Sequence, residues 1–372
     1  MGYEDDIRIL RERIDDIDSR LVPLFEQRMR TSDDIAEVKK RYGKPIFDAS
    51  RENDVISRAL SRLMDGENGE AARRFFRALM DLSKQRQHTH LQPGSGLNDS
   101  SNPAVGFLGL KGSFSHIAAC EAFGENAPLK NYDAFEDMFE ALSRGEIGRA
   151  ILPAENTETG SITAVVDLLA KYGYFIIAER LLKVEHSLLG LPEAELADIT
   201  QVCSHPEPIM QCSRFLHAHP SISAFPALST AQAAMTVAER KDKTLGCIAA
   251  IQSAREYGLK VLAENIQNSQ GNSTRFVVVA RYPLLTPACD KTSIVFKVEH
   301  RPGSLCDMLR VFTGINILKL ESRPLKDRPF EYLFHLDFEG SAENETVKRI
   351  LDEAKSAAAD LIWLGSYPRM LL

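Results

Sequence analysis

The segment at residues 91–103, LQPGSGLNDSSNP, constrains the fold of this chain more than any other feature. It is dense in glycine, proline, serine and asparagine and has no apolar periodicity, which is typical of a linker between domains. A weaker break lies near residues 282–291, where Pro283 and Pro287 interrupt two strand-like runs. The 372 residues also exceed what one hydrophobic core usually organises. We therefore predict a multidomain protein with domains at residues 1–92, 104–282 and 290–372.

The first domain is predicted to be all-helical. Its opening residues repeat apolar side chains at heptad spacing, at Ile7, Leu10, Ile14, Ile17, Leu21 and Leu24. Pro23 lies inside this pattern and should kink the helix, or cost about 3 kcal/mol if the helix stays straight. Two further helices are expected, one ending near residue 64 and one over residues 70–88. Three helices of such unequal length leave the apolar repeat exposed, so we expect a second copy and an intertwined dimer.

The second domain is predicted to be α/β, because strand-like runs alternate with helical stretches such as 115–123 and 231–240. The runs are AVGFLG, RAILPAE, YFIIAER, DITQVCS, TLGCIAA and TRFVVVA. The third domain shows the order strand, helix, strand, strand, helix, strand. This order is typical of the ferredoxin-like α+β fold.

Composition narrows the possible partners. The net charge of −7 argues against nucleic acid or an anionic membrane as the main partner. No apolar run approaches the roughly 18 residues of a membrane span, and the start MGYEDDIRIL lacks the apolar core of a signal peptide. The six cysteines form no C-x-x-C pair, so we expect reduced thiols and a cytoplasmic protein. The histidines are scattered, and we expect neither a metal nor a cofactor.

Polar residues in the first domain follow a recognisable pattern. Arg28 and Lys39 are 11 residues apart and therefore share one helix face. The motifs D-x-x-R-E and S-x-x-x-Q come later in the chain. The full set is Arg11, Arg28, Lys39, Asp48, Arg51, Glu52, Ser83 and Gln87. Each residue alone is most simply interpreted as a solvated surface residue, but together they resemble the all-helical chorismate mutase family.

This resemblance implies a binding site for chorismate, a small dianion. Arg11 and Arg28 would hold its two carboxylates. Ser83 and Arg51 would complete the set of side chains around these carboxylates.

The same resemblance assigns donors to the breaking bond. Lys39 and Gln87 would donate to the ether oxygen, while Glu52 and the backbone at Asp48 would bind the hydroxyl group. A pericyclic rearrangement to prephenate needs no nucleophile or base. It needs only a compact substrate conformer and donors where charge develops.

Five segments of the second domain resemble the prephenate dehydratases. They are FLGLKGSFSHIAA (107–119), LPAENTETGSI (152–162), SHPEPIMQCSRFL (204–216), LSTAQAA (228–234) and NSTRFVVVA (272–280). The resemblance implies two α/β subdomains with prephenate in the cleft between them. It also marks Thr274 as the residue most expected to be essential.

The residue types suit a reaction in which prephenate loses carbon dioxide and hydroxide. Three groups can anchor its carboxylates: Asn156, Ser204 and Arg275. A general acid must protonate the departing hydroxyl, and Thr274 can donate a hydrogen bond but is a weak acid. Glu155 or His205 could supply the proton, and the sequence leaves this choice open. His205 could equally be a structural or surface histidine, and Glu155 a loop carboxylate.

The third domain contains HRPGSLCDML (300–309) and GINILKLESRP (314–324), which resemble the amino-acid-binding ACT module of prephenate dehydratases. The family's ligand is phenylalanine, bound between two modules. The positions carried over are Gly303, Ser304, Leu305, Cys306, Asn316, Glu321 and Ser322. The stretch at 312–316 is about two residues shorter than the family pattern. The alternative is a plain dimerisation module.

The leading interpretation is a bifunctional cytoplasmic enzyme that converts chorismate to prephenate and then to phenylpyruvate, inhibited by phenylalanine and assembled as a homodimer or higher homo-oligomer. One alternative is a solute-binding regulatory protein, because two-lobed α/β clefts also occur in binding proteins. Another keeps the enzyme class but uses arogenate, the amino analogue of prephenate.

Overall fold

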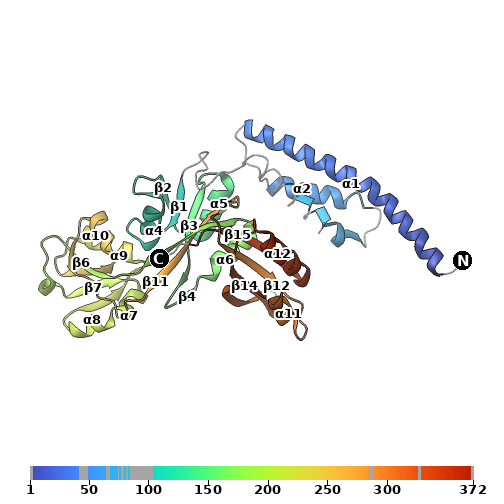
Figure 1. Cartoon of the computed structure of the whole chain (residues 1–372). Coiled ribbons are helices and arrows are strands. Elements are labelled where there is room, and N and C mark those ends of the chain that lie inside the picture. The colour runs from blue at the N-terminus through green and yellow to red at the C-terminus, as the bar shows by residue number, and fades with distance from the viewer. Residues whose placement is uncertain are drawn as a thin grey trace. The chain divides into compact units, whose positions relative to one another are not determined.

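The computed structural model describes two compact units, Met1–Gly94 and Ser95–Leu372 (Figure 1). The described residues are 3–41, 49–63, 68–73, 75–76, 79–80, 83, 104–284, 286, 288–325 and 328–369. The second unit contains both the α/β part (residues 104–284) and the segment after it, here called the C-terminal module (residues 288–369).

The first unit is built on one long helix, α1 (Tyr3–Arg41), followed by α2 (Ala49–Leu60). The helix continues through Pro23, where a kink was expected. The surrounding side chains are exposed, so water can satisfy the carbonyl that the proline leaves unbonded. The second helix ends at Leu60, before the predicted residue 64. Most described residues of 68–83 are helical, with Leu79 and Met80 buried.

The heptad repeat on α1 forms an exposed apolar seam within the single chain. It comprises Leu10, Ile14, Ile17, Leu21 and Leu24, whose exposed fractions run from 45% to 61%. A row of large apolar side chains with this exposure is unusual on the surface of a monomeric protein and indicates a face that binds another molecule.

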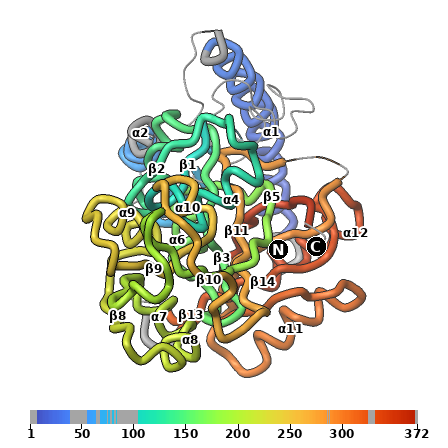
Figure 2. The backbone as a smooth tube through the Cα atoms, turned by 90° about the vertical axis from the view of Figure 1, so that its left-hand side faces the viewer, coloured from blue at the N-terminus to red at the C-terminus, as the bar shows by residue number. Residues whose placement is uncertain are grey.

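The α/β part forms two lobes, each with its own sheet (Figure 1), and Figure 2 shows the backbone with the second lobe toward the viewer. The first sheet has the order β2-β1-β3-β11-β5, with β4 paired to β3. Its strands are β1 (Val105–Leu108), β2 (Leu129–Tyr132), β3 (Arg149–Asn156), β4 (Gly160–Ser161), β5 (Phe175–Lys183) and β11 (Ser273–Ala280). Its helices are α4 (Phe114–Phe123), α5 (Phe135–Arg144) and α6 (Thr163–Tyr172).

The second sheet has the order β10-β6-β9-β7-β8. Its strands are β6 (Ser187–Gly190), β7 (Gln201–Ser204), β8 (Ser223–Pro226), β9 (Leu245–Ala249) and β10 (Lys260–Ala263). Its helices are α7 (Pro206–Gln211), α8 (Ser213–Ala218), α9 (Thr230–Arg240) and α10 (Ile251–Tyr257), with a 3-10 turn at Leu196–Asp198. The chain enters this lobe after β5 and returns at β11, so the start of β11 lies where the two lobes join. All six predicted strands are confirmed, and the α/β prediction with them.

The C-terminal module is a four-stranded antiparallel sheet in the order β13-β14-β12-β15 with two helices. Its elements are β12 (Lys291–Lys297), α11 (Ser304–Arg310), β13 (Ile317–Leu325), β14 (Arg328–Glu339), α12 (Glu345–Ala357) and β15 (Asp360–Tyr367). No described helix is long and apolar enough to cross a membrane. All six cysteines carry free thiols.

The module packs on the first sheet, where β15 lies against β5. Gly365 makes this close approach possible. A Cβ atom there would lie 2.4 Å from the carbonyl oxygen of Ile176, and the residue has a φ of +125°. Glycine is therefore required both by space and by backbone conformation.

We expect Gly365→Ala to destabilise the second unit by at least about 2 kcal/mol, because it adds backbone strain and overpacking together. Thermal unfolding of the full chain measures the loss. Gly314→Ala is the matched control, because Gly314 has a φ of +94° but nothing within 4 Å of the added Cβ. Equal losses in the two variants would show that the close approach contributes nothing.

Candidate active sites

Two of the residues predicted to bind chorismate meet in the first unit. The Arg28 guanidinium donates to the Leu79 carbonyl at 3.0 Å and to the Ser83 hydroxyl. Ser83 is 6% exposed and donates to the same Leu79 carbonyl at 2.8 Å. Partial burial lowers the pKa of Arg28 from its ordinary value. A half-buried guanidinium beside a hydroxyl is a suitable anchor for a carboxylate.

Arg11 is not brought to this cluster within the chain. It is exposed on α1, and the continuous helix places it roughly 25 Å from Arg28 along the axis. Five predicted residues or their side chains lie outside the described residues: Lys39, Asp48, Arg51, Glu52 and Gln87.

Thr274 and Asn156 form a polar pair where the chain returns from the second lobe. They are register partners on β11 and β3. Asn156 Nδ2 donates to Thr274 Oγ1 at 2.9 Å and to Asn272 Oδ1 at 2.7 Å. Because Thr274 Oγ1 accepts this hydrogen bond, its own proton can be donated elsewhere. Thr274 is 8% exposed, so such a donor acts in a largely water-free setting.

A pocket of about 650 Å³ lies beside this pair and is lined by both lobes. Its wall includes Thr159, His205, Gln211, Gln267, Asn268 and Asn272. Asn156 also connects to the wall, because its Oδ1 accepts from the backbone N–H groups of Glu158 at 2.9 Å and Thr159 at 3.1 Å. A concave pocket between two lobes, with a few polar side chains in its wall, is the usual place for a small ligand.

A buried histidine lies behind the pocket wall. His186 is 1% exposed, and its Nε2 lies 2.9 Å from Gln211 Oε1. Burial lowers the pKa of His186, which favours the neutral ring. Its Nδ1 and Gln267 Nε2 have no hydrogen-bond partner among the described residues. Neither Gln211 nor His186 was predicted from the sequence as a site residue, although Gln211 lies in segment 204–216, which resembles the dehydratases.

Two of the predicted carboxylate anchors, Arg275 and Ser204, do not line this pocket. Thr274 and Arg275 are neighbours on one strand, so their side chains point to opposite faces. The Arg275 guanidinium instead donates to Asp337 at 2.9 Å and to Glu179 at 3.1 Å. Ser204 is fully buried, and its hydroxyl donates to the Ile248 carbonyl at 2.6 Å.

The two candidate general acids are also separated. His205 is exposed and lines the pocket. Glu155 is the register partner of Arg275 and lies on that face of the sheet. Its carboxylate forms an ion pair with Lys319 at 3.0 Å and lies 3.5 Å from Arg275 Nε. His205 is therefore the candidate that can reach a ligand in the pocket.

The C-terminal module has a pocket of about 440 Å³ at the start of α11. Four predicted ligand positions line it: Gly303, Ser304, Leu305 and Cys306. Gly303 precedes the helix with a φ of +84°. Asn316, Glu321 and Ser322 do not line this pocket in the single chain. Asn316 precedes β13, and the other two lie on that strand.

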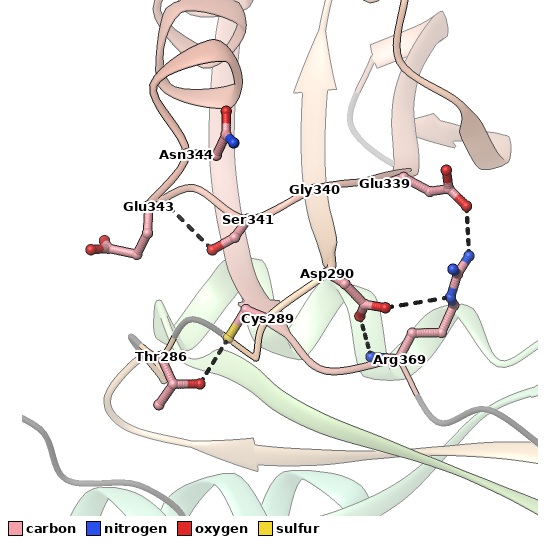
Figure 3. Close-up of a pocket in the computed structure, with 9 residues that line it drawn as sticks. All are labelled: Thr286, Cys289, Asp290, Glu339, Gly340, Ser341, Glu343, Asn344 and Arg369. Atoms are coloured by element: carbon pink, nitrogen blue, oxygen red, sulfur yellow. Dashed lines mark hydrogen bonds and ion pairs between the residues drawn. The ribbon is translucent and has the colours of Figure 1, made fainter.

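Another pocket, of about 570 Å³, lies where the module meets the preceding segment (Figure 3). Arg369 crosses it, donating from its side chain to Glu339 at 2.7 Å and from its backbone to Asp290 at 2.5 Å. No predicted site residue lines this pocket. The described residues contain no group of three or more His, Cys, Asp or Glu side chains that could hold a metal ion.

The helical first unit and the α/β part of the second unit each match a known protein family. The family model for chorismate mutase type II matches residues 10–88, and that for prephenate dehydratase matches residues 105–283. A protein from Aquifex aeolicus described as a bifunctional chorismate mutase/prephenate dehydratase is 32% identical over 375 residues, covering 99% of each chain. The chain belongs to the bifunctional chorismate mutase/prephenate dehydratase family.

As a member of this family, the chain is an enzyme of phenylalanine biosynthesis that rearranges chorismate to prephenate and converts prephenate to phenylpyruvate. This confirms the bifunctional interpretation and removes the solute-binding alternative.

Solved structures match the second unit. The prephenate dehydratase from Arthrobacter aurescens in complex with L-Phe is 31% identical with a TM-score of 0.66, covering 72% of this chain and 90% of that chain. A structure described as a quorum-quenching acylase, GqqA, has the same TM-score at 29% identity, covering 72% and 98%. Because one fold carries both descriptions, the family assignment rests on the match along the whole chain.

Proposed function

We propose that Thr274 is the central catalytic donor of the dehydratase. The observation that carries this proposal is its hydrogen bond from Asn156 beside the interlobe pocket. In the reaction, the bond from the ring to the carboxylate breaks, its electrons shift through the ring, and the opposite C–O bond breaks. Thr274 would donate a hydrogen bond to the departing oxygen, and His205 at the pocket wall would supply the proton that makes water.

We infer that arogenate, which carries an ammonium group where prephenate has a carbonyl, is the second compound to test beside prephenate. Two carboxylates, Glu158 and Glu207, line the pocket and could pair with that ammonium group. Measuring kcat/KM for both compounds separates the alternatives. A higher value for prephenate would show a preference for the keto acid, and a higher value for arogenate would show a preference for the amino acid.

For the mutase, we propose that Arg28 and Ser83 bind one carboxylate of chorismate and that Arg11 of a second chain binds the other. Lys39, Asp48, Arg51, Glu52 and Gln87 keep the roles that the family resemblance implies. The exposed apolar seam of α1 supports a homodimer, because a second helix would cover it.

We further propose that the C-terminal module is a ferredoxin-like ACT domain that binds phenylalanine and inhibits the dehydratase. Its strand order and the pocket at Gly303 support this assignment. Backbone N–H groups at the start of α11 suit the carboxylate of an amino acid. The free thiols fit a reducing compartment, and we propose the cytoplasm.

Titration of the full chain with phenylalanine tests the regulatory role. We expect saturable heat and inhibition of the dehydratase, because an effector must bind two states differently. Gly303→Val should weaken binding at least about tenfold by filling the backbone approach. Mutase activity serves as the control. The absence of both heat and inhibition would leave the module as a dimerisation element.

A further inference from the structure

A cluster of buried charges joins the C-terminal module to the α/β part. Its centre is Asp337 on β14, which is 1% exposed. The Arg275 guanidinium donates to Asp337 Oδ2 at 2.9 Å and to Glu179 Oε2 at 3.1 Å. Lys291 Nζ donates to the same Glu179 oxygen at 2.8 Å. Asp337 and Lys291 belong to the module, whereas Arg275 and Glu179 belong to the first sheet. The module and the first sheet are therefore joined by one network of buried ion pairs.

The module holds Asp337 firmly in its ionised form. Its Oδ1 accepts from the Ser293 hydroxyl at 2.6 Å and lies 3.0 Å from His335 Nε2. Burial alone would raise the pKa of Asp337, but His335, Arg275 and Lys291 hold it well below its ordinary value. Asp337 therefore presents a fixed negative charge to Arg275.

Arg275 directly follows Thr274 on β11, beside an irregular point of the neighbouring strand β3. The register with β3 pairs Thr274 with Asn156 and Arg275 with Glu155, and it shifts directly after Arg275, at Phe276. The unpaired residue is Ala154 of β3, and such a bulge bends its own strand and re-aims the neighbouring side chains. The pairing of Thr274 with Asn156 thus lies next to the point where β3 bends, and the C-terminal module contacts both members of the adjacent pair, Arg275 and Glu155.

We propose that Asp337 of the C-terminal module is a positioning residue for dehydration, which fixes Thr274 against Asn156 by holding Arg275. The inference rests on the proposed role of Thr274. Asp337 itself touches no substrate. A second contact acts on the partner strand, because Lys319 Nζ of the module donates to Ser161 Oγ at 2.6 Å and pairs with Glu155 at 3.0 Å. The module is therefore part of the dehydratase as well as its proposed sensor.

The test is Asp337→Asn in the full chain, which removes the charge and keeps the shape. We expect kcat for prephenate to fall about tenfold to a hundredfold with KM within about threefold, because small misplacements of a reacting group have large effects. Mutase activity should not change. Asp360→Asn is the matched control, because it removes a surface carboxylate of the same module, 3.9 Å from Lys297. An unchanged kcat in folded Asp337→Asn protein overturns the inference.

A double variant shows whether Asp337 acts through Arg275. If it does, Arg275→Met with Asp337→Asn loses no more kcat than Arg275→Met alone, because coupled residues are not additive. A merely structural role would give the product of the two losses, and that result also overturns the inference.

If Asp337→Asn shows no cooperative unfolding transition, Ser293→Ala takes its place. It keeps the Asp337 carboxylate and removes a hydroxyl that donates to Asp337 and is also hydrogen-bonded to the Tyr367 hydroxyl. For Ser293→Ala we expect kcat to fall about threefold to fivefold, and an unchanged kcat overturns the inference.

Thr274→Ala separates the proposed catalytic role of Thr274 from the proposed positioning role of Asp337. Full activity in that variant contradicts the proposed function, whereas its inactivity beside a normal Asp337→Asn variant contradicts this inference alone.

Discussion

Thr274→Ala is expected to lower prephenate dehydration by about a hundredfold to a thousandfold, the usual effect of removing one preorganised donor from a site that excludes water. Chorismate should still be converted, so prephenate should accumulate. The reason is that Thr274 and the Arg28–Ser83 cluster lie in separate compact units. Following prephenate and phenylpyruvate together after addition of chorismate measures both steps in one experiment.

Two further variants make the Thr274 result interpretable. Thr274→Ser keeps the hydroxyl and should retain activity within about tenfold. Thr236→Ala removes a half-buried threonine hydroxyl from α9, where it donates to the Gln232 carbonyl, and should leave both steps unchanged. Comparable loss of both activities in Thr274→Ala would indicate one shared site, and normal dehydration would exclude Thr274 as the donor.

The sequence predicted the strands that carry strong apolar runs and missed several that do not. β2 (LKNY) and β8 (SAFP) lie at the edges of their sheets and are mostly half-buried or exposed. An edge strand pairs on one side only and needs little apolar surface, so neither composition nor period 2 reveals it.

Three of the five segments that resemble the dehydratases reach the pocket, and not every residue in them faces it. Thr274 and Arg275 were both predicted to act on prephenate, while the pleat of the strand sends them to opposite sides. The hydroxyl of Ser204 satisfies a buried carbonyl, a demand that only the folded sheet creates. The partner of Arg275, Asp337, is 62 residues away in the chain, so no local rule could have found it.

Nothing in the sequence indicated how closely the parts on either side of residue 285 pack. Two prolines there predicted a boundary between the second and third domains, and residues 95–372 together form one compact unit. The reason is the contact surface itself. Gly365 allows β15 to approach β5, and the charges around Asp337 come from both sides. A short connection with prolines does not by itself separate two bodies when their surfaces are complementary.

The distance between Arg11 and Arg28 leads to the most demanding test of the mutase. They lie 17 residues apart on one continuous helix, roughly 25 Å along the axis and about 100° apart in rotation. Chorismate is far too small to reach both from one straight helix. If both bind it, Arg11 must come from a second chain, whose helix would also cover the exposed seam.

Mixing two inactive variants tests this shared site. Arg11→Ala and Arg28→Ala proteins should each lose most mutase activity. After chains exchange, each mixed dimer has one site with both arginines intact and one site with neither. Random pairing makes half of the dimers mixed, so the mixture should recover about a quarter of wild-type activity, provided that the two sites act independently. Two affinity tags, one on each variant, verify the exchange. Mixed dimers with no activity above that of the two parents would show that each site is built from one chain, and Arg11 would then be a surface residue.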